Sequence, residues 1–452
     1  MESCLNLVQD VLCDSTNPCP VLYNCIDGAC VHKDIFPMTQ RELFGSVLAI
    51  FLVGMANTGG LGGAFISSPI LMIIFNYDPL PAIRIVYCMT FGGAIGSFLH
   101  SVTGKRKNSQ KPLIDYDLAL ICTPMLVAGA SIGVLLNSFL PPFLTLGCLV
   151  YLMVQSLKKI YRNARIQREK ENKPPQQQEN PGVELRENSR QRLNSEYREY
   201  LSVIHHPELQ LIQMEEAMQF PWQKYREFII LLIIMMGLFV IKGTRTFSSL
   251  IGIEYCSLSY WLFYAMSIVV CLYFGKKDEK LVAEAQEIKQ HALLEEPPYI
   301  REQAENQSFL TPENSKYMSK ISFISGILAG MLGIGGGVIM NPIMMEIGVS
   351  GEVATATSGL FVLFTSFISM FQTIMTGGVQ LKTALYFGPL AFFGALGVSM
   401  YLKYLVNKYK RPSLILYALV LITLVGTIVV PLFAIQRSIS NPSVMFKFGS
   451  FC

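Results

Sequence analysis

Two glycine-rich stretches of this chain carry residue types that could bind a small anion. The first runs from Gly60 through Gly62 and Gly63 to Pro69, and the second from Gly333 to Pro342. Aligned position by position, the two share three glycines, an isoleucine and the proline. Glycines followed by a proline interrupt a helix. The helix that restarts there offers free N–H groups and the positive end of its dipole, which together attract an oxyanion.

We expect the substrate contacts to come from these two stretches and from the hydroxyl residues that follow the second. The candidates are Gly60, Gly62, Gly63, Ser67 and Pro69, then Gly333, Gly335, Gly336, Gly337, Asn341 and Pro342, then Thr355 and Ser358. Each type also has a structural alternative. Glycines let membrane helices pack closely, serines bond back to their own helix, and hydroxyls cap helices.

The sequence offers no catalytic or cofactor motif. The five histidines form no HExxH pattern, and the second glycine cluster lacks the GxGxxG spacing that follows a strand in dinucleotide-binding folds. The net charge of +4 is small and gives no indication of a nucleic-acid partner. We therefore expect no enzyme activity, no cofactor, no metal site and no nucleic-acid partner.

The composition indicates a protein that crosses the lipid bilayer several times. The chain is 51% hydrophobic and 15% charged, whereas soluble domains carry about a quarter charged residues. The apolar segments cover residues 44–57, 61–75, 81–102, 118–136, 143–157, 228–241, 258–274, 321–332, 338–347, 353–375, 384–405 and 414–434. These lengths predict an all-α polytopic membrane fold.

The two halves of the membrane region match beyond the glycine stretches. Pro124 with Gly129-Ala-Ser-Ile-Gly133 corresponds to Pro389 with Gly394-Ala-Leu-Gly397. This predicts two repeats of about five segments, the first two of each being short or broken. The expected divisions are a Cys-rich head (1–42), the first repeat (43–157), a loop (158–226), an inserted helical hairpin (227–275), a loop (276–318), the second repeat (319–435) and a tail (436–452). The short segments are either half-helices or tilted spans.

The basic residues set the expected orientation. Basic loops follow residues 81–102, 143–157, 258–274 and 384–405, so these four ends should be cytoplasmic. Counting the membrane crossings from these ends, the first repeat starts outside and the second inside. The two repeats are then inverted relative to each other, as in transporters that work by alternating access. The head and tail fall on the extracytoplasmic side, in the plasma membrane or an endomembrane. Disulfides fit that side, with Cys4, Cys13, Cys19, Cys25, Cys30 and Cys256 as candidates; a zinc-binding knuckle is the alternative for the head.

At the glycine motifs the chain resembles the TauE/SafE family of sulfite exporter-like membrane proteins. The resemblance rests on Gly333-Ile-Gly-Gly-Gly-Val-Ile-Met-Asn-Pro342, on Ala354-Thr-Ala-Thr-Ser358, and on the helix with Pro389. The head and long loop are similar to those of eukaryotic members, protists included. The family implies export or import of sulfite, a sulfonate or a related organic anion, coupled to a proton or sodium gradient. The first copy differs, with Ala64 where the second has Gly337, so the two halves are not equivalent.

Two classes of function follow from these patterns. The first is a secondary transporter that holds a small anion at the two glycine motifs. The alternative is a membrane receptor or scaffold, in which the Cys-rich head binds a ligand and the cytoplasmic loop recruits partners.

Overall fold

The computed structural model describes most of the membrane region. It covers residues 8–12, 19, 22–26, 29–58, 62–106, 111–172, 207–244, 247–295, 310, 312–377, 379–409, 413–440, 446 and 448–449. The first helices are α1 (Gln40–Thr58), α2 (Ala64–Ile73), α3 (Pro79–Ser101), α4 (Tyr116–Phe139), α5 (Pro142–Asn172), α7 (Pro207–Ala217), α8 (Trp222–Lys242) and α9 (Leu258–Glu295). The second group is α11 (Pro312–Leu332), α12 (Gly337–Glu346), α13 (Gly351–Met375), α14 (Leu381–Tyr409) and α15 (Ser413–Ser440).

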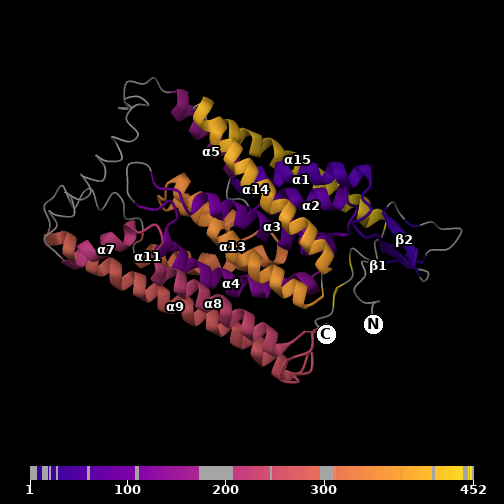
Figure 1. Ribbon diagram of the computed structural model, residues 1–452, viewed down its shortest axis with the longest axis horizontal. Helices are drawn as coiled ribbons and strands as arrows, with labels where there is room; N and C mark the ends of the chain where they lie inside the picture. Colours follow the sequence, from indigo (N-terminus) through magenta and orange to yellow (C-terminus); the bar gives the residue numbers. More distant parts are fainter. Residues whose placement is uncertain are drawn as a thin grey trace.

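The bundle of long helices confirms the predicted all-α polytopic membrane fold (Figure 1). Six helices of the described part are long and apolar enough to cross a bilayer: α3, α4, α5, α9, α13 and α14. The strands lie at one end of the bundle and α7 lies at the other. We call these the head end and the α7 end.

The head contains a small sheet, which the sequence did not predict. β1 (Val8–Leu12), β2 (Tyr23–Ile26) and β3 (Ala29–His32) pair antiparallel in the order β1-β3-β2. The sheet rests on the loop between α2 and α3. His32 stacks on Tyr77, its Nε2 lies 2.8 Å from the Phe75 carbonyl oxygen, and the Tyr23 hydroxyl donates to the Asn76 carbonyl. Aromatic contacts and backbone pairing thus fix the head without a large core.

The cysteines of the head end are partly visible. Cys19, Cys25 and Cys256 are each disulfide-bonded. Cys25 also faces Cys30 across the β2–β3 pair. Cys4, Cys13 and the side chain of Cys30 lie outside the described residues, so the pairing of these cysteines stays a prediction.

Small residues let the two halves of the chain interlock. Gly129 and Gly133 of α4 lie directly against the backbone of α11, where Gly326 and Gly330 face them in return. Because neither helix has a Cβ at these points, the backbones approach closely. Close packing, the structural alternative for glycine, is therefore the role of these four residues. A helix of the first half is thereby bound to a helix of the second.

Two loops are shorter than predicted because helices continue into them. α5 runs to Asn172 and α9 to Glu295, where the loops were expected to begin near 158 and 276. Residues just beyond the apolar segments are good helix formers such as Lys, Arg, Glu and Ala, and no proline appears before Pro174 or Pro297. A charged residue marks where a helix leaves the bilayer, not where it ends. The tail also differs, since α15 extends to Ser440.

Candidate functional site

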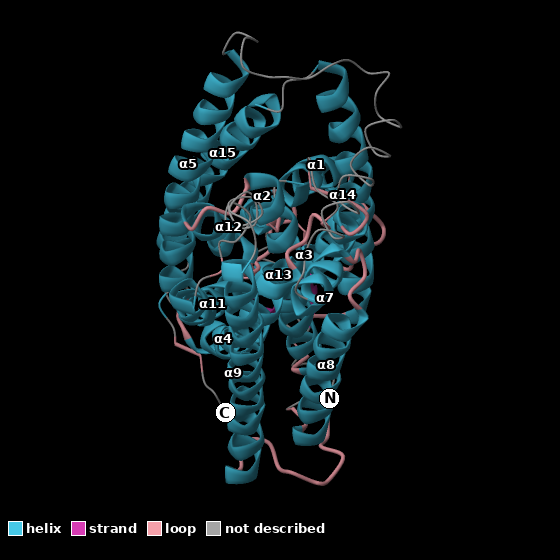
Figure 2. Cartoon of the chain, turned by 90° about the vertical axis from the view of Figure 1, so that its left-hand side faces the viewer, coloured by secondary structure: helices cyan, strands magenta, loops and turns pink. Residues whose placement is uncertain are grey.

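Two ten-residue helices begin at the glycine clusters. α2 starts at Ala64 directly after Gly63, and α12 starts at Gly337 directly after Gly336. Ten residues give a helix about 15 Å long, which is half of a hydrocarbon core of roughly 30 Å. Only the second segment of each expected pair has this length, since α1 and α11 before them have 19 and 21 residues. In Figure 2, α2 and α12 lie between the α5–α15 pair and the α1–α14 pair.

The two half-helices return to opposite ends of the bundle. α2 ends at the head, where the Phe75 carbonyl contacts His32. α12 ends at the α7 end, where Glu346 lies 3.5 Å from Lys159 of α5. Their first residues therefore point toward the middle from opposite sides. Inverted repeats would produce this arrangement, although the repeat relationship itself stays a prediction.

The two glycine clusters touch each other in the middle of the bundle. A methyl group added to Gly62 would lie 2.7 Å from the carbonyl oxygen of Ile334 in the other cluster. The buried side chain of Val362 on α13 packs against Gly62, Gly335 and Gly337, so one residue contacts both clusters. Proximity of the clusters was the main structural expectation from the sequence, and the coordinates agree with it. Gly60 lies outside the described residues.

Left-handed backbone explains why glycine is needed at four of these positions. The φ angles are 71° at Gly62, 73° at Gly63, 74° at Gly333 and 72° at Gly335. Residues with a Cβ adopt this region only with strain. The aligned pair formed by Gly62 and Gly335 has nearly the same angle. The next aligned pair differs, since φ is 73° at Gly63 and −62° at Gly336.

Backbone donors without an acceptor line the start of both half-helices. Within the described part of the chain, the amides of Ala64, Gly337, Val338 and Ile339 make no hydrogen bond. These are the orphan N–H groups that every helix start leaves. Buried donors of this kind are normally satisfied by a side chain, water or a ligand. Gly337 packs directly against Ser358 and Val362 of α13, so α13 has to shift before an anion can reach this amide.

Two threonines hold the second cluster in place. The Gly336 amide donates to Thr365 Oγ1 of α13 at 3.1 Å. From the other side, Thr90 Oγ1 of α3 donates to the Gly333 carbonyl at 3.2 Å. Neither threonine was among the predicted residues. Thr365 lies seven residues after Ser358, two helical turns along the same face of α13, and this spacing could have identified it.

The predicted hydroxyl residues lie at the site but donate to their own helices. Ser67 Oγ donates to the Gly63 carbonyl at 3.0 Å, and Ser358 Oγ to the Ala354 carbonyl at 2.6 Å. Each oxygen retains a lone pair but no free proton, so neither serine is an anion donor in this conformation. Both serines therefore follow the structural alternative, in which the hydroxyl proton is donated to the serine's own helix.

The remaining predicted residues shape the second half-helix. The Asn341 amide approaches Thr355 Oγ1 at 3.5 Å and connects α12 to α13. Pro342 lies inside α12, as Pro69 lies inside α2. The described glycines of both clusters are buried, and Ser67 and Ser358 are fully buried. The centre is therefore closed to both ends in this conformation.

An all-α bundle that surrounds two half-helices meeting near its middle is the architecture of a membrane transporter. Comparison of the sequence with known protein families agrees with this class of protein. The model described as Sulfite exporter TauE/SafE matches residues 44–186 and 222–429, and the chain belongs to this family.

Several curated plant proteins are similar over most of their length. Sulfite exporter TauE/SafE family protein 1 of Arabidopsis thaliana is 26% identical over 400 residues, which covers 85% of this chain and 82% of the relative. Family protein 2 of the same plant is 25% identical, with 84% and 80% covered. Family protein 5 is 25% identical, with 88% and 84% covered. No solved structure matches the chain.

Proposed function

We propose that the protein is a secondary transporter of a small oxyanion such as sulfite or a sulfonate. The anion is held between the two glycine clusters, mainly by backbone N–H groups. One observation carries the proposal: the starts of α2 and α12, with their unpaired amides, meet at the centre of the bundle. The printed names of the related plant proteins favour sulfite among small anions.

Backbone donors suit a site that must release its ligand. A buried Lys or Arg in the bilayer is expensive to maintain, whereas helix N-termini supply partial positive charge without ionisation. The glycines let the anion approach the amides closely, and Thr365 and Thr90 keep the second cluster in shape.

Transport would proceed by alternating access. The clusters are buried in this conformation, so an anion reaches them only after one end opens. The α7 end carries the predicted cytoplasmic loops, and the head end carries the disulfide-bonded cysteines. We therefore place the head outside or in the lumen, and α7 in the cytoplasm. A proton or sodium gradient would drive the cycle.

Flux measurements test the proposal. The full chain is reconstituted in vesicles, and uptake of labelled sulfite, sulfate, thiosulfate and small sulfonates is followed under proton and sodium gradients. The expected result is saturable, electrochemically driven uptake of one or more of these anions. Absence of flux for every anion under every gradient would contradict it. Deleting residues 1–32 distinguishes the receptor alternative, because a transporter retains flux without a ligand-binding head.

A further inference from the structure

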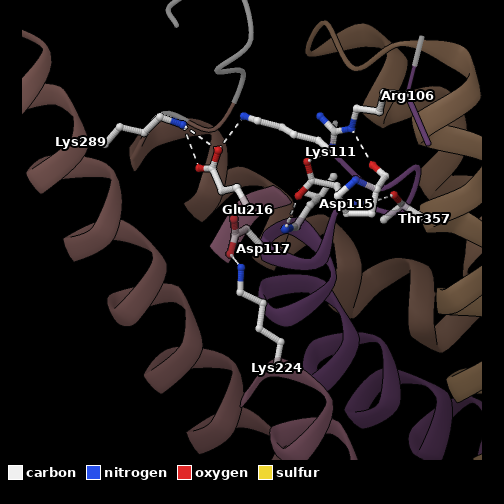
Figure 3. Close-up of polar contacts among 10 residues, drawn as sticks. Arg106, Lys111, Asp115, Asp117, Glu216, Lys224, Lys289 and Thr357 are labelled. Atoms are coloured by element: carbon white, nitrogen blue, oxygen red, sulfur yellow. Dashed lines mark hydrogen bonds and ion pairs between the residues drawn. The ribbon is translucent and has the colours of Figure 1, made fainter. Parts of the chain in front are cut away.

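A cluster of charged residues links three parts of the chain at the α7 end (Figure 3). Its cations are Arg106, Lys111, Lys224 and Lys289, and its carboxylates are Asp115, Asp117 and Glu216. We call it the α7 cluster. The proposed anion site does not use these groups.

Glu216 of α7 occupies the centre of this cluster. Lys111 lies 2.6 Å from its Oε2, and Lys289 lies 2.8 Å from its Oε1. All three side chains are at most 14% exposed. Burial raises the pKa of Glu216, but the charges and hydrogen bonds of the two lysines outweigh burial and lower it to about 2. The two lysines therefore form a site that fits one carboxylate.

The neighbouring residue shows that this contact is specific. Glu215 is 41% exposed, and its nearest cation, Lys224, is 3.8 Å away. Exposed pairs at that distance contribute little to stability. The same helix thus carries one acidic side chain that is held by two buried lysines and one that is more exposed and only loosely paired.

The docked segment joins the α3–α4 connection of the first half to α9. Lys111 belongs to the connection between α3 and α4, and Lys289 to the extended part of α9. In the same connection, the Asp115 amide donates to Thr357 Oγ1 of α13 at 3.0 Å. Just after α7, Gln219 Nε2 donates to the Gly104 carbonyl at 3.1 Å. These bonds hold α3, α4, α9 and α13 together at this end.

We infer that Lys111 and Lys289 form a carboxylate-binding site for Glu216, and that docking of α7 in this site keeps the α7 end of the transporter closed. Opening toward this end moves the α3–α4 connection, which also contacts α13 through Asp115, and docked α7 opposes that movement because it ties the connection to α9. The inference rests on the proposed alternating access. Undocking removes three charge-assisted hydrogen bonds, one from Lys111 and two from Lys289, so docking can bias the closed state substantially.

Thiol accessibility tests the inference without any substrate. A reporter cysteine replaces the partly buried Thr355, at the α7 end of α13. Inside-out vesicles are then treated with a membrane-impermeant maleimide. We expect Glu216→Gln to accelerate labelling by about tenfold, the order expected for losing charge-assisted hydrogen bonds. Glu215→Gln, the matched control, should leave the rate unchanged. Equal rates in the two variants would overturn the inference, whether or not any anion is transported.

A cross-link tests the same contact when the Gln variant does not fold. Glu216→Cys and Lys289→Cys are joined by a bifunctional methanethiosulfonate, which spans the space left by the two longer side chains and fixes α7 in place. We expect the cross-link to form, flux to stop, and reductant to restore it. Unchanged flux with a complete cross-link would show that α7 stays docked throughout the cycle, which contradicts the inference. If no anion is transported at all, the proposed function fails while the labelling result still decides the role of docking.

Discussion

Replacing Gly62 by alanine tests the contact between the two glycine clusters. Gly62 has a φ of 71°, and the new methyl group would lie 2.7 Å from the Ile334 carbonyl oxygen. The left-handed conformation costs an alanine about 1–2 kcal/mol. The clash cannot be relieved by a rotamer change because the neighbour is backbone, so the two clusters must move apart. We therefore expect a total destabilisation of about 2–4 kcal/mol and loss of anion uptake.

The assay compares this variant with a neutral glycine replacement nearby. A methyl group on Gly359 of α13 meets no atom within 4 Å and has no left-handed angle to strain. Both variants are purified and measured for thermal unfolding and for flux in vesicles. Gly359→Ala should behave like the natural chain, while Gly62→Ala should melt earlier and transport poorly. If Gly62→Ala transports with the same flux and the same apparent affinity as the natural chain, the idea that the two clusters form one site is refuted.

Three further changes have defined outcomes. Thr365→Val removes the acceptor for the Gly336 amide; it should lower affinity for the anion in a binding titration and cost about 1–3 kcal/mol of stability, with Thr365→Ser restoring both. For Glu216, a pKa lowered to about 2 means that its contribution to stability is complete above a pH of about 4.5 and is lost as the pH falls toward 2. The free energies of unfolding of Glu216→Gln and the natural chain should therefore differ by up to about 3 kcal/mol at pH 7 and become equal in acid. A difference that stays constant with pH would contradict the ion pairing. His32→Ala removes the stack and the contact with α2, and should lower the melting temperature, whereas the same change at the exposed His291 should not.

The sequence predicted the centre of the fold because its signals there are local. Glycine clusters followed by Pro69 and Pro342 specify a helix break and a helix start by backbone chemistry alone. Duplication of the motif then indicated that the two breaks share a site. The observed starts at Ala64 and Gly337 agree with this prediction.

Other features could not be predicted because they depend on distant partners. Glu216 and Lys111 are 105 residues apart, and nothing in either local sequence indicates that they pair. Thr90 contacts Gly333 across 243 residues. The sheet of the head was missed because strands of four or five residues give only a weak periodic signal. The helix ends at Asn172 and Glu295 were not predicted, because the loops were expected to begin at the first charged residues after the apolar segments.

Locating a bound anion tests the central claim most directly. The full chain is crystallised or imaged with selenite, whose selenium can be located by anomalous scattering as an analogue of sulfite. The proposal predicts a peak between Gly62 and the amides of Gly337, Val338 and Ile339, lost in Gly62→Ala and retained in Gly359→Ala. Selenite bound only elsewhere, for example between Lys111 and Lys289, would contradict the proposal that the two half-helices hold the transported anion.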